Sequence, residues 1–147
     1  MVALTLWGLA WMENQIETSV ELVTAGKKIA IGNDLVFLPN FELSFTEPFK
    51  NKAYTNAEMA YCDQFADSLL RYASTWAAKE AVYKALKQLD DATLGWKKIE
   101  IIRKKNAGEP QVLLHNNPAK FKISLTISHD GDYVWAIALV DTELTSL

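Results

Sequence analysis

The most informative stretch of this sequence is Trp76-Ala-Ala-Lys79-Glu80-Ala-Val-Tyr-Lys84-Ala-Leu86. The run predicts a helix that carries Glu80 and Lys84 on one face, because helical residues four positions apart lie about 5–6 Å apart at Cβ. A carboxylate beside an ammonium group can hold a metal ion and a phosphate together. The same spacing also fits an ordinary surface ion pair, which it favours when taken by itself. The apolar surroundings of the pair and the rest of the chain decide between the two interpretations.

The composition of the chain describes one globular domain. Its 147 residues are half hydrophobic and 22% charged, which allows a sizeable core. The net charge of −3 argues against a general nucleic-acid-binding surface, so no nucleic-acid partner is expected. Cys62 is the only cysteine, which excludes an intramolecular disulfide and a zinc site built on cysteine pairs. This cysteine usage favours a reducing, cytoplasmic location.

We expect residues 1–27 to form an accessory segment that precedes a domain of residues 28–147. The chain opens with an apolar run, but no Lys or Arg precedes Lys27, so the run lacks the positive charge of a signal peptide. The run is also too short to cross a bilayer, and no membrane partner is expected. Residues 13–24 predict an amphipathic helix that ends before Gly26.

The first half of the domain predicts one strand followed by helices. Residues 28–37 are rich in β-branched side chains and predict a strand that enters a turn at residues 32–34. Residues 41–54 predict a loop with a short helix. Helices are expected at residues 57–71, after a capping box, and at residues 75–89, and the two helices could be continuous.

The second half of the domain predicts antiparallel strands. Turn residues at 106–110 and 129–132 separate short apolar runs and would form hairpins. The four expected strands cover residues 99–102, 111–114, 121–127 and 133–140. We therefore predict an α+β fold, in which a single domain packs an antiparallel β-sheet against a long helix.

Polar residues occur at three points in otherwise apolar surroundings. Asp34 follows Gly32 at the end of the first strand, Glu80 and Lys84 lie in the alanine-rich helix, and Ser128 and His129 end the strand before the last hairpin. Two carboxylates and a lysine suit a Mg²⁺-bound pyrophosphate, since Mg²⁺ usually takes one or two protein carboxylates and fills its shell with water and phosphate oxygens. Asp34 also fits an ordinary turn residue, and His129 an ordinary surface histidine.

In their order along the chain, these motifs resemble those of the 4′-phosphopantetheinyl transferase superfamily. The short, single-domain holo-acyl-carrier-protein synthase group is the most similar. The resemblance covers residues 28 to 141, and the helix motif is its most specific part. The motifs that carry it are Gly32-Asn33-Asp34, the run from Trp76 to Leu86, Gly108-Glu109-Pro110, and Ser128-His129 before a final apolar strand.

The resemblance implies transfer of the 4′-phosphopantetheine group from coenzyme A to a serine of an apo acyl or peptidyl carrier protein. Such a reaction depends on Mg²⁺, releases adenosine 3′,5′-bisphosphate and serves pathways such as fatty acid biosynthesis. By similarity, Asp34 and Glu80 would hold the metal, and Glu80 and Lys84 would be catalytic. The implied assembly is a homotrimer with active sites between subunits. The positions implied in coenzyme A binding are Lys79, Lys84, Gly108, Pro110, Ser128 and His129.

The chain departs from the family pattern at several positions. Thr75 stands where a basic residue is common, Glu109 where a lysine is common, and Ser124 where a histidine is often found. These changes affect the expected recognition of the 3′-phosphate of coenzyme A more than metal binding. Residues 36–47 contain two glutamates and no Lys or Arg, so the acidic carrier proteins of the family would gain little from charge attraction there.

Two alternatives follow from the residues. The departures from the family pattern favour a non-catalytic member that binds coenzyme A or a carrier protein. An unrelated α+β domain, in which Glu80 and Lys84 form only a surface ion pair, is the third interpretation. It requires the carboxylates of Asp34 and Glu80 to lie far apart.

Overall fold

The computed structural model describes residues 12–15, 17, 29–89, 93–104, 108–116 and 121–142. In the predicted accessory segment, residues 12–15 and 17 are helical, and the rest of the helix expected at 13–24 lies outside the described residues. Among the residues that the structure describes, no helix has the length and apolar character needed to cross a membrane.

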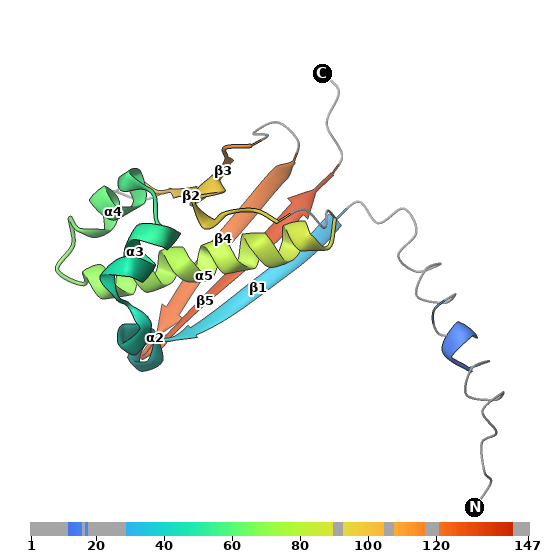
Figure 1. The fold of residues 1–147 in the computed structure, drawn as a ribbon, viewed down its shortest axis with the longest axis horizontal. Coiled ribbons are helices and arrows are strands. Elements are labelled where there is room, and N and C mark those ends of the chain that lie inside the picture. Colours follow the sequence, from blue (N-terminus) through green and yellow to red (C-terminus); the bar gives the residue numbers. More distant parts are fainter. Residues whose placement is uncertain are drawn as a thin grey trace, which may run out of the picture.

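A three-stranded antiparallel sheet forms one layer of the domain (Figure 1). Strand β5 (Tyr133–Asp141) is central, with β1 (Ile29–Phe37) on one side and β4 (Lys122–Asp130) on the other. Two further strands, β2 (Ile99–Ile102) and β3 (Gln111–Leu114), pair as a separate antiparallel ribbon. This arrangement confirms the predicted α+β fold with an antiparallel sheet.

The long helix α5 (Ser68–Lys87) lies across one face of the three-stranded sheet (Figure 1). It packs through small side chains, and Ala81 and Ala85 are fully buried. Gly32 of β1 is opposite them, and a Cβ built on it would lie only 2.0 Å from the carbonyl oxygen of Ala81. The backbones of strand and helix therefore touch here, which requires a residue without a side chain.

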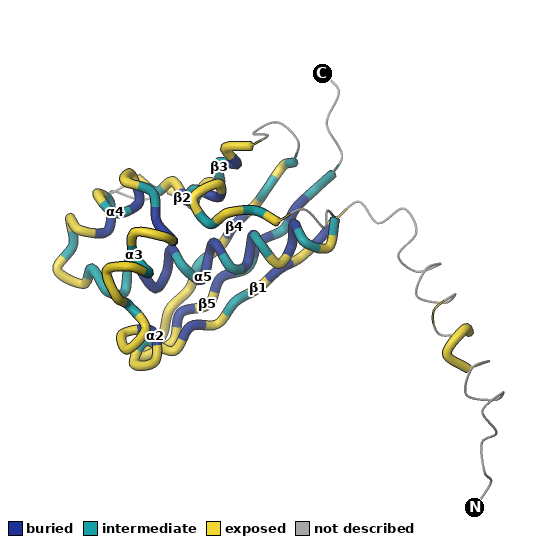
Figure 2. The backbone as a smooth tube through the Cα atoms, viewed as in Figure 1, coloured by how far each residue is buried: buried dark blue, intermediate teal, exposed yellow. Residues whose placement is uncertain are grey.

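Short helices close one end of the domain. They are α2 (Leu38–Ser44), α3 (Glu47–Ala53) and α4 (Asn56–Cys62), and the burial pattern in Figure 2 shows that their exposed residues face outward. A 3₁₀ turn, η1 (Trp96–Lys98), leads into β2. The region expected at 41–54 to be a loop with a short helix is thus mostly helical.

The turn predicted at residues 32–34 does not form. Strand β1 is continuous from Ile29 to Phe37, and each of its residues pairs with one of β5. The Gly-Asn-Asp sequence favours a turn locally, but nine paired residues and the close packing of Gly32 on α5 outweigh that preference.

The helix boundaries also differ from the prediction. The helix expected at 57–71 ends at Cys62, and α5 begins at Ser68 rather than at residue 75. Ser74, just before the expected start, lies inside α5, where its hydroxyl donates to the carbonyl oxygen of Leu70 at 2.7 Å. A serine satisfied in this way is tolerated in a helix interior. The predicted capping box at the start of α4 is confirmed.

The last hairpin is longer than predicted. Strand β4 continues through Ser128 and His129 to Asp130, so the turn is reduced to Gly131 and Asp132. Gly131 has φ of 53°, a left-handed conformation that glycine adopts without strain. The strands expected at 99–102 and 111–114 are confirmed with those bounds, and the last strand extends one residue beyond the expected 133–140.

Candidate active site

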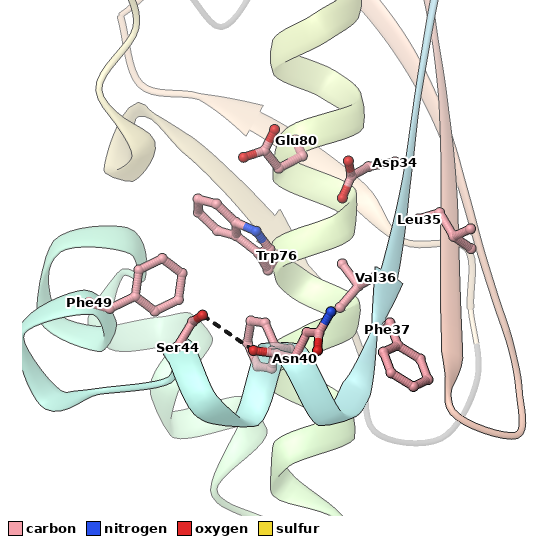
Figure 3. A pocket seen from close by; sticks show the side chains of 10 residues that line it. Asp34, Leu35, Val36, Phe37, Asn40, Ser44, Phe49, Trp76 and Glu80 are labelled. Carbon is pink, nitrogen blue, oxygen red and sulfur yellow. Dashed lines mark hydrogen bonds between the residues drawn. The ribbon is translucent and has the colours of Figure 1, made fainter.

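A pocket of about 530 Å³ opens where β1, α2 and α5 meet (Figure 3). Asp34 reaches it from the strand and Glu80 from the helix, and Figure 3 shows the two carboxylates beside each other at one end. The other lining residues are mostly apolar: Leu35, Val36, Phe37, Asn40, Phe41, Ser44, Phe49 and Trp76. Figure 3 shows the side chains of Leu35 and Phe37 pointing away from the other lining residues, on the far side of β1. The pocket therefore combines two acidic groups with a mainly aromatic wall.

Lys84 binds one of these two carboxylates, that of Asp34. Its ammonium group donates to Asp34 Oδ1 at 2.6 Å and to the carbonyl oxygen of Asn33 at 3.2 Å. Helical spacing places it one turn from Glu80. The structure thus brings together Asp34, Glu80 and Lys84, although they come from elements about fifty positions apart in the chain.

The pKa of Glu80 is raised, first by burial and then by the negative charge of Asp34, while Lys84 opposes the shift. Two adjacent carboxylates offer hard oxygen ligands to a cation. Among the described residues, no group of three or more His, Cys, Asp or Glu side chains could hold a metal. A donor set of two carboxylates fits Mg²⁺, which keeps several positions for water and phosphate oxygens.

The expected contact of Lys79 with coenzyme A does not fit its place in the structure. Its side chain has no exposed surface and forms a 2.6 Å ion pair with Glu58. Burial lowers the pKa of Lys79, and the Glu58 carboxylate opposes that shift. The ammonium points into the core because internal acceptors satisfy it there, so a ligand contact would require these partners to be displaced.

Four other expected coenzyme A positions do not line the pocket of the single chain. Gly108 is exposed, and Pro110 is half-buried just before β3. Ser128 and His129 are exposed on β4, which β5 separates from β1. One chain therefore does not gather these residues around Asp34 and Glu80.

Thr75, one of the departures from the family pattern, is fully buried. Arg103, which follows β2, donates to the hydroxyl of Thr75 and to the carbonyl oxygen of Arg71 at 3.1 Å. The Arg103 guanidinium also lies over the ring of Tyr61, 4.5 Å from its centroid. This position is thus part of the packing between β2 and α5. The other two departures, Glu109 and Ser124, are exposed.

Sequence reasoning missed the aromatic wall of the pocket. Phe49 on α3 and Trp76 on α5 line the pocket and have ring centroids 4.9 Å apart. The ring of Trp96, which is not a lining residue, extends this aromatic wall, with its centroid 4.7 Å from that of Trp76. Trp76 opens the helix motif and so had a signal in the sequence. Phe49 and Trp96 had none, because only the packing of α3 and η1 against α5 brings them to this place.

Residues 30–138 match the model of the 4′-phosphopantetheinyl transferase superfamily. The match covers most of the chain, and the protein therefore belongs to this superfamily.

Individual relatives agree with this assignment. The chain is 36% identical over 113 residues to the holo-[acyl-carrier-protein] synthase of Chlorobaculum parvum, covering 75% of this chain and 96% of that protein. It is 38% identical over 140 residues to the fatty acid synthase alpha subunit hexA of Dothistroma septosporum, covering 88% of this chain. The match spans only 8% of that much longer relative.

The fold is shared with solved structures. The ACPS–CoA complex of Chronobacterium ammoniagenes superposes with a TM-score of 0.66 at 25% sequence identity, covering 79% of this chain and 98% of that one. The superposition thus covers nearly all of that structure.

Proposed function

We propose that this protein transfers the 4′-phosphopantetheine group of coenzyme A to a serine hydroxyl of an apo carrier protein and releases adenosine 3′,5′-bisphosphate. The observation that carries the proposal is that Asp34 and Glu80 line one pocket, with Lys84 bonded to Asp34, in a member of the transferase superfamily. The chain matches nearly the whole length of the Chlorobaculum relative, which is named as a holo-[acyl-carrier-protein] synthase. This match supports the same reaction.

Each residue of the trio has a role that its environment supports. Asp34 and Glu80 would hold Mg²⁺, which when bound offsets the negative charge of a pyrophosphate. Glu80 has a raised pKa, which makes it a suitable acceptor for the proton of the attacking serine hydroxyl. The half-exposed ammonium of Lys84 is able to reach a phosphate oxygen and to stabilise the departing group.

The proposal is tested by incubating the protein with coenzyme A, Mg²⁺ and a panel of apo carrier proteins, and then weighing the carriers. A carrier from fatty acid synthesis is the first choice, because the Dothistroma relative is named as a fatty acid synthase subunit. Gain of the phosphopantetheine mass is expected. The Glu80→Gln variant should remain folded and lose transfer, while Glu42→Gln, which removes an exposed charge outside the pocket, should keep it.

The assay also separates the alternative of a non-catalytic binding protein. That alternative is favoured by Thr75, which is buried under Arg103 and leaves no basic group at its position on α5. A protein that binds coenzyme A but modifies no carrier in a broad panel would support it and contradict the transferase proposal.

We further propose that the protein acts as a homotrimer. On the face of the sheet opposite α5, strands β1 and β5 expose large apolar side chains, with exposed fractions from 36% at Phe37 to 61% at Leu35. An exposed apolar face of this kind indicates an interaction surface. Three subunits are proposed because the resemblance to the holo-acyl-carrier-protein synthase group implies a trimer. Its other large exposed residues are Ile29, Ile31, Tyr133 and Trp135.

Association through this face would also complete the active site. The coenzyme A positions Gly108, Pro110, Ser128 and His129 do not line the pocket of their own chain. A neighbouring subunit could present them to it. We place the assembly in the cytoplasm, where coenzyme A is available and where the free Cys62 thiol fits.

Light scattering after size-exclusion chromatography tests the assembly. Trp135→Glu places a charge on the central strand of the exposed face, directly opposite Leu35 in the sheet register, and should yield monomers. The matched control is Leu43→Glu, because Leu43 is 83% exposed but lies on α2. A monomeric wild-type protein with full transfer activity would contradict the trimer.

A further inference from the structure

A buried ion pair joins several segments of the chain behind the candidate active site. Lys79 and Glu58 have side chains that are 0% and 1% exposed, and Lys79 Nζ lies 2.6 Å from Glu58 Oε2. The same ammonium donates to the carbonyl oxygens of Ala53 at 2.6 Å and of Trp96 at 3.1 Å. Its three donors are thereby all used. Glu58 in turn accepts 2.8 Å bonds from the backbone N–H groups of Thr55 and Ile101.

The two carbonyl contacts matter because each lies on a segment that carries an aromatic neighbour of Trp76. The carbonyl of Ala53 belongs to the last residue of α3. The same helix carries Phe49, whose ring centroid lies 4.9 Å from that of Trp76. The second carbonyl belongs to Trp96, whose ring lies 4.7 Å from Trp76 and 5.0 Å from Tyr83. Trp76 and Tyr83 are each one helical turn from Glu80, before and after it on the same face of α5.

We propose that Lys79 is a positioning residue, whose ammonium holds the segments of Phe49 and Trp96 against Trp76 and thereby keeps the aromatic wall beside Glu80 in place. The inference rests on the proposed transfer reaction, because its consequence is kinetic. It also accounts for the inward direction of a lysine that directly precedes Glu80 in the sequence.

A pair that only stabilised the fold would behave differently. Removing one partner leaves a buried charge without compensation, whereas neutralising both partners removes that penalty. The double variant Lys79→Met with Glu58→Gln should therefore regain much of the stability lost in Lys79→Met. The methionine removes the donor that the carbonyls of Ala53 and Trp96 share, so the two segments lose the tether between them.

Two further variants separate the charge from the tether. Glu58→Gln keeps one side-chain oxygen for Lys79 and leaves the ammonium free to donate to both carbonyls, so it should keep its rate. It should lower stability, because the buried ammonium loses its counter-charge and the N–H group of Ile101 loses its acceptor. Leu125→Ala truncates a core residue on β4, outside the network, and shows the effect of lower stability alone.

The experiment measures transfer to the carrier while coenzyme A is varied, below the unfolding temperature of every variant. We expect kcat of the double variant to fall about 10- to 100-fold, since a displacement of about 1 Å costs up to that much, with little change in KM. Glu58→Gln and Leu125→Ala should stay near the wild type. If the double variant does not fold, Trp96→Ala takes its place in the assay. It removes the Trp96 ring from beside Trp76 and should give the same loss of kcat.

Circular dichroism provides a readout that does not depend on activity. The close pair of Trp76 and Trp96 should give an exciton signal, which Trp96→Phe abolishes and so assigns. The signal should weaken in the double variant and persist in Leu125→Ala. A folded double variant with the full signal and wild-type kcat overturns the proposal. If the wild-type protein transfers nothing but its exciton signal still weakens when Lys79 is replaced, the proposed reaction is contradicted and the tether is not.

Discussion

The close contact between β1 and α5 makes Gly32→Ala the most informative substitution in this protein. A Cβ at residue 32 would lie 2.0 Å from the carbonyl oxygen of Ala81 and 2.6 Å from the amide nitrogen of Ala85. Real Cβ atoms stay at least 3.0 Å from such neighbours, and both neighbours are backbone atoms of a buried helix. No side-chain rotation can relieve the clash, so the strand and the helix must separate by about 1 Å.

This separation acts directly on the candidate active site. Asp34 lies two residues along β1 on the same face of the strand as Gly32, and Glu80 and Lys84 lie on the helix that is pushed away. The 2.6 Å bond between Lys84 and Asp34 would lengthen beyond hydrogen-bonding range. We expect the free energy of unfolding to fall by about 1–3 kcal/mol, as for other overpacked cores. Transfer activity should fall by about 10²-fold, the usual consequence of a displacement of about 1 Å.

The assay compares kcat/KM for carrier modification with urea unfolding of the same samples. Gly95→Ala is the matched control, because a Cβ at residue 95 would meet no atom within 4 Å and its φ of −67° is one that alanine accepts. It should preserve both activity and stability. Gly32→Ala with activity within twofold of the wild type would refute the argument that this contact sets the geometry of the site.

Three further predictions follow from the same structure. Lys84→Met should lower kcat by about 10²-fold, because it removes the cation proposed to stabilise the departing group. The free energy of unfolding should change by less than about 1 kcal/mol, because the Lys84 side chain is half-exposed; kinetics and urea titration measure the two effects. Cys62 is buried and burial raises the pKa of its thiol, so iodoacetamide should modify it in denaturant but not in the native protein, as mass spectrometry can show. Raising salt from low to physiological concentration should change carrier affinity only modestly, because residues 36–47 carry no Lys or Arg, and a steep dependence in a binding titration would count against this.

The local sequence was sufficient for the elements whose signals are short-range. The capping box of Thr55 and Glu58 marked the start of α4, and the alternating residues of β4 marked a half-buried strand. Where local preference and packing disagreed, packing decided. The Gly-Asn-Asp run at residues 32–34 has turn chemistry, yet pairing with β5 keeps it extended.

The sequence by itself determined that this is an α+β domain, and it singled out Asp34, Glu80 and Lys84 as the residues on which the proposed chemistry depends. These residues belong to motifs, and a motif is recognised from its residue types and their order along the chain alone. Only the tertiary structure decided where the neighbouring side chains point. Lys79 stands next to Glu80 in the chain, but one step along a helix turns it about 100° around the axis, into the core and onto Glu58. The direction of a side chain depends on what packs against each face of the helix, and that is a property of the folded domain.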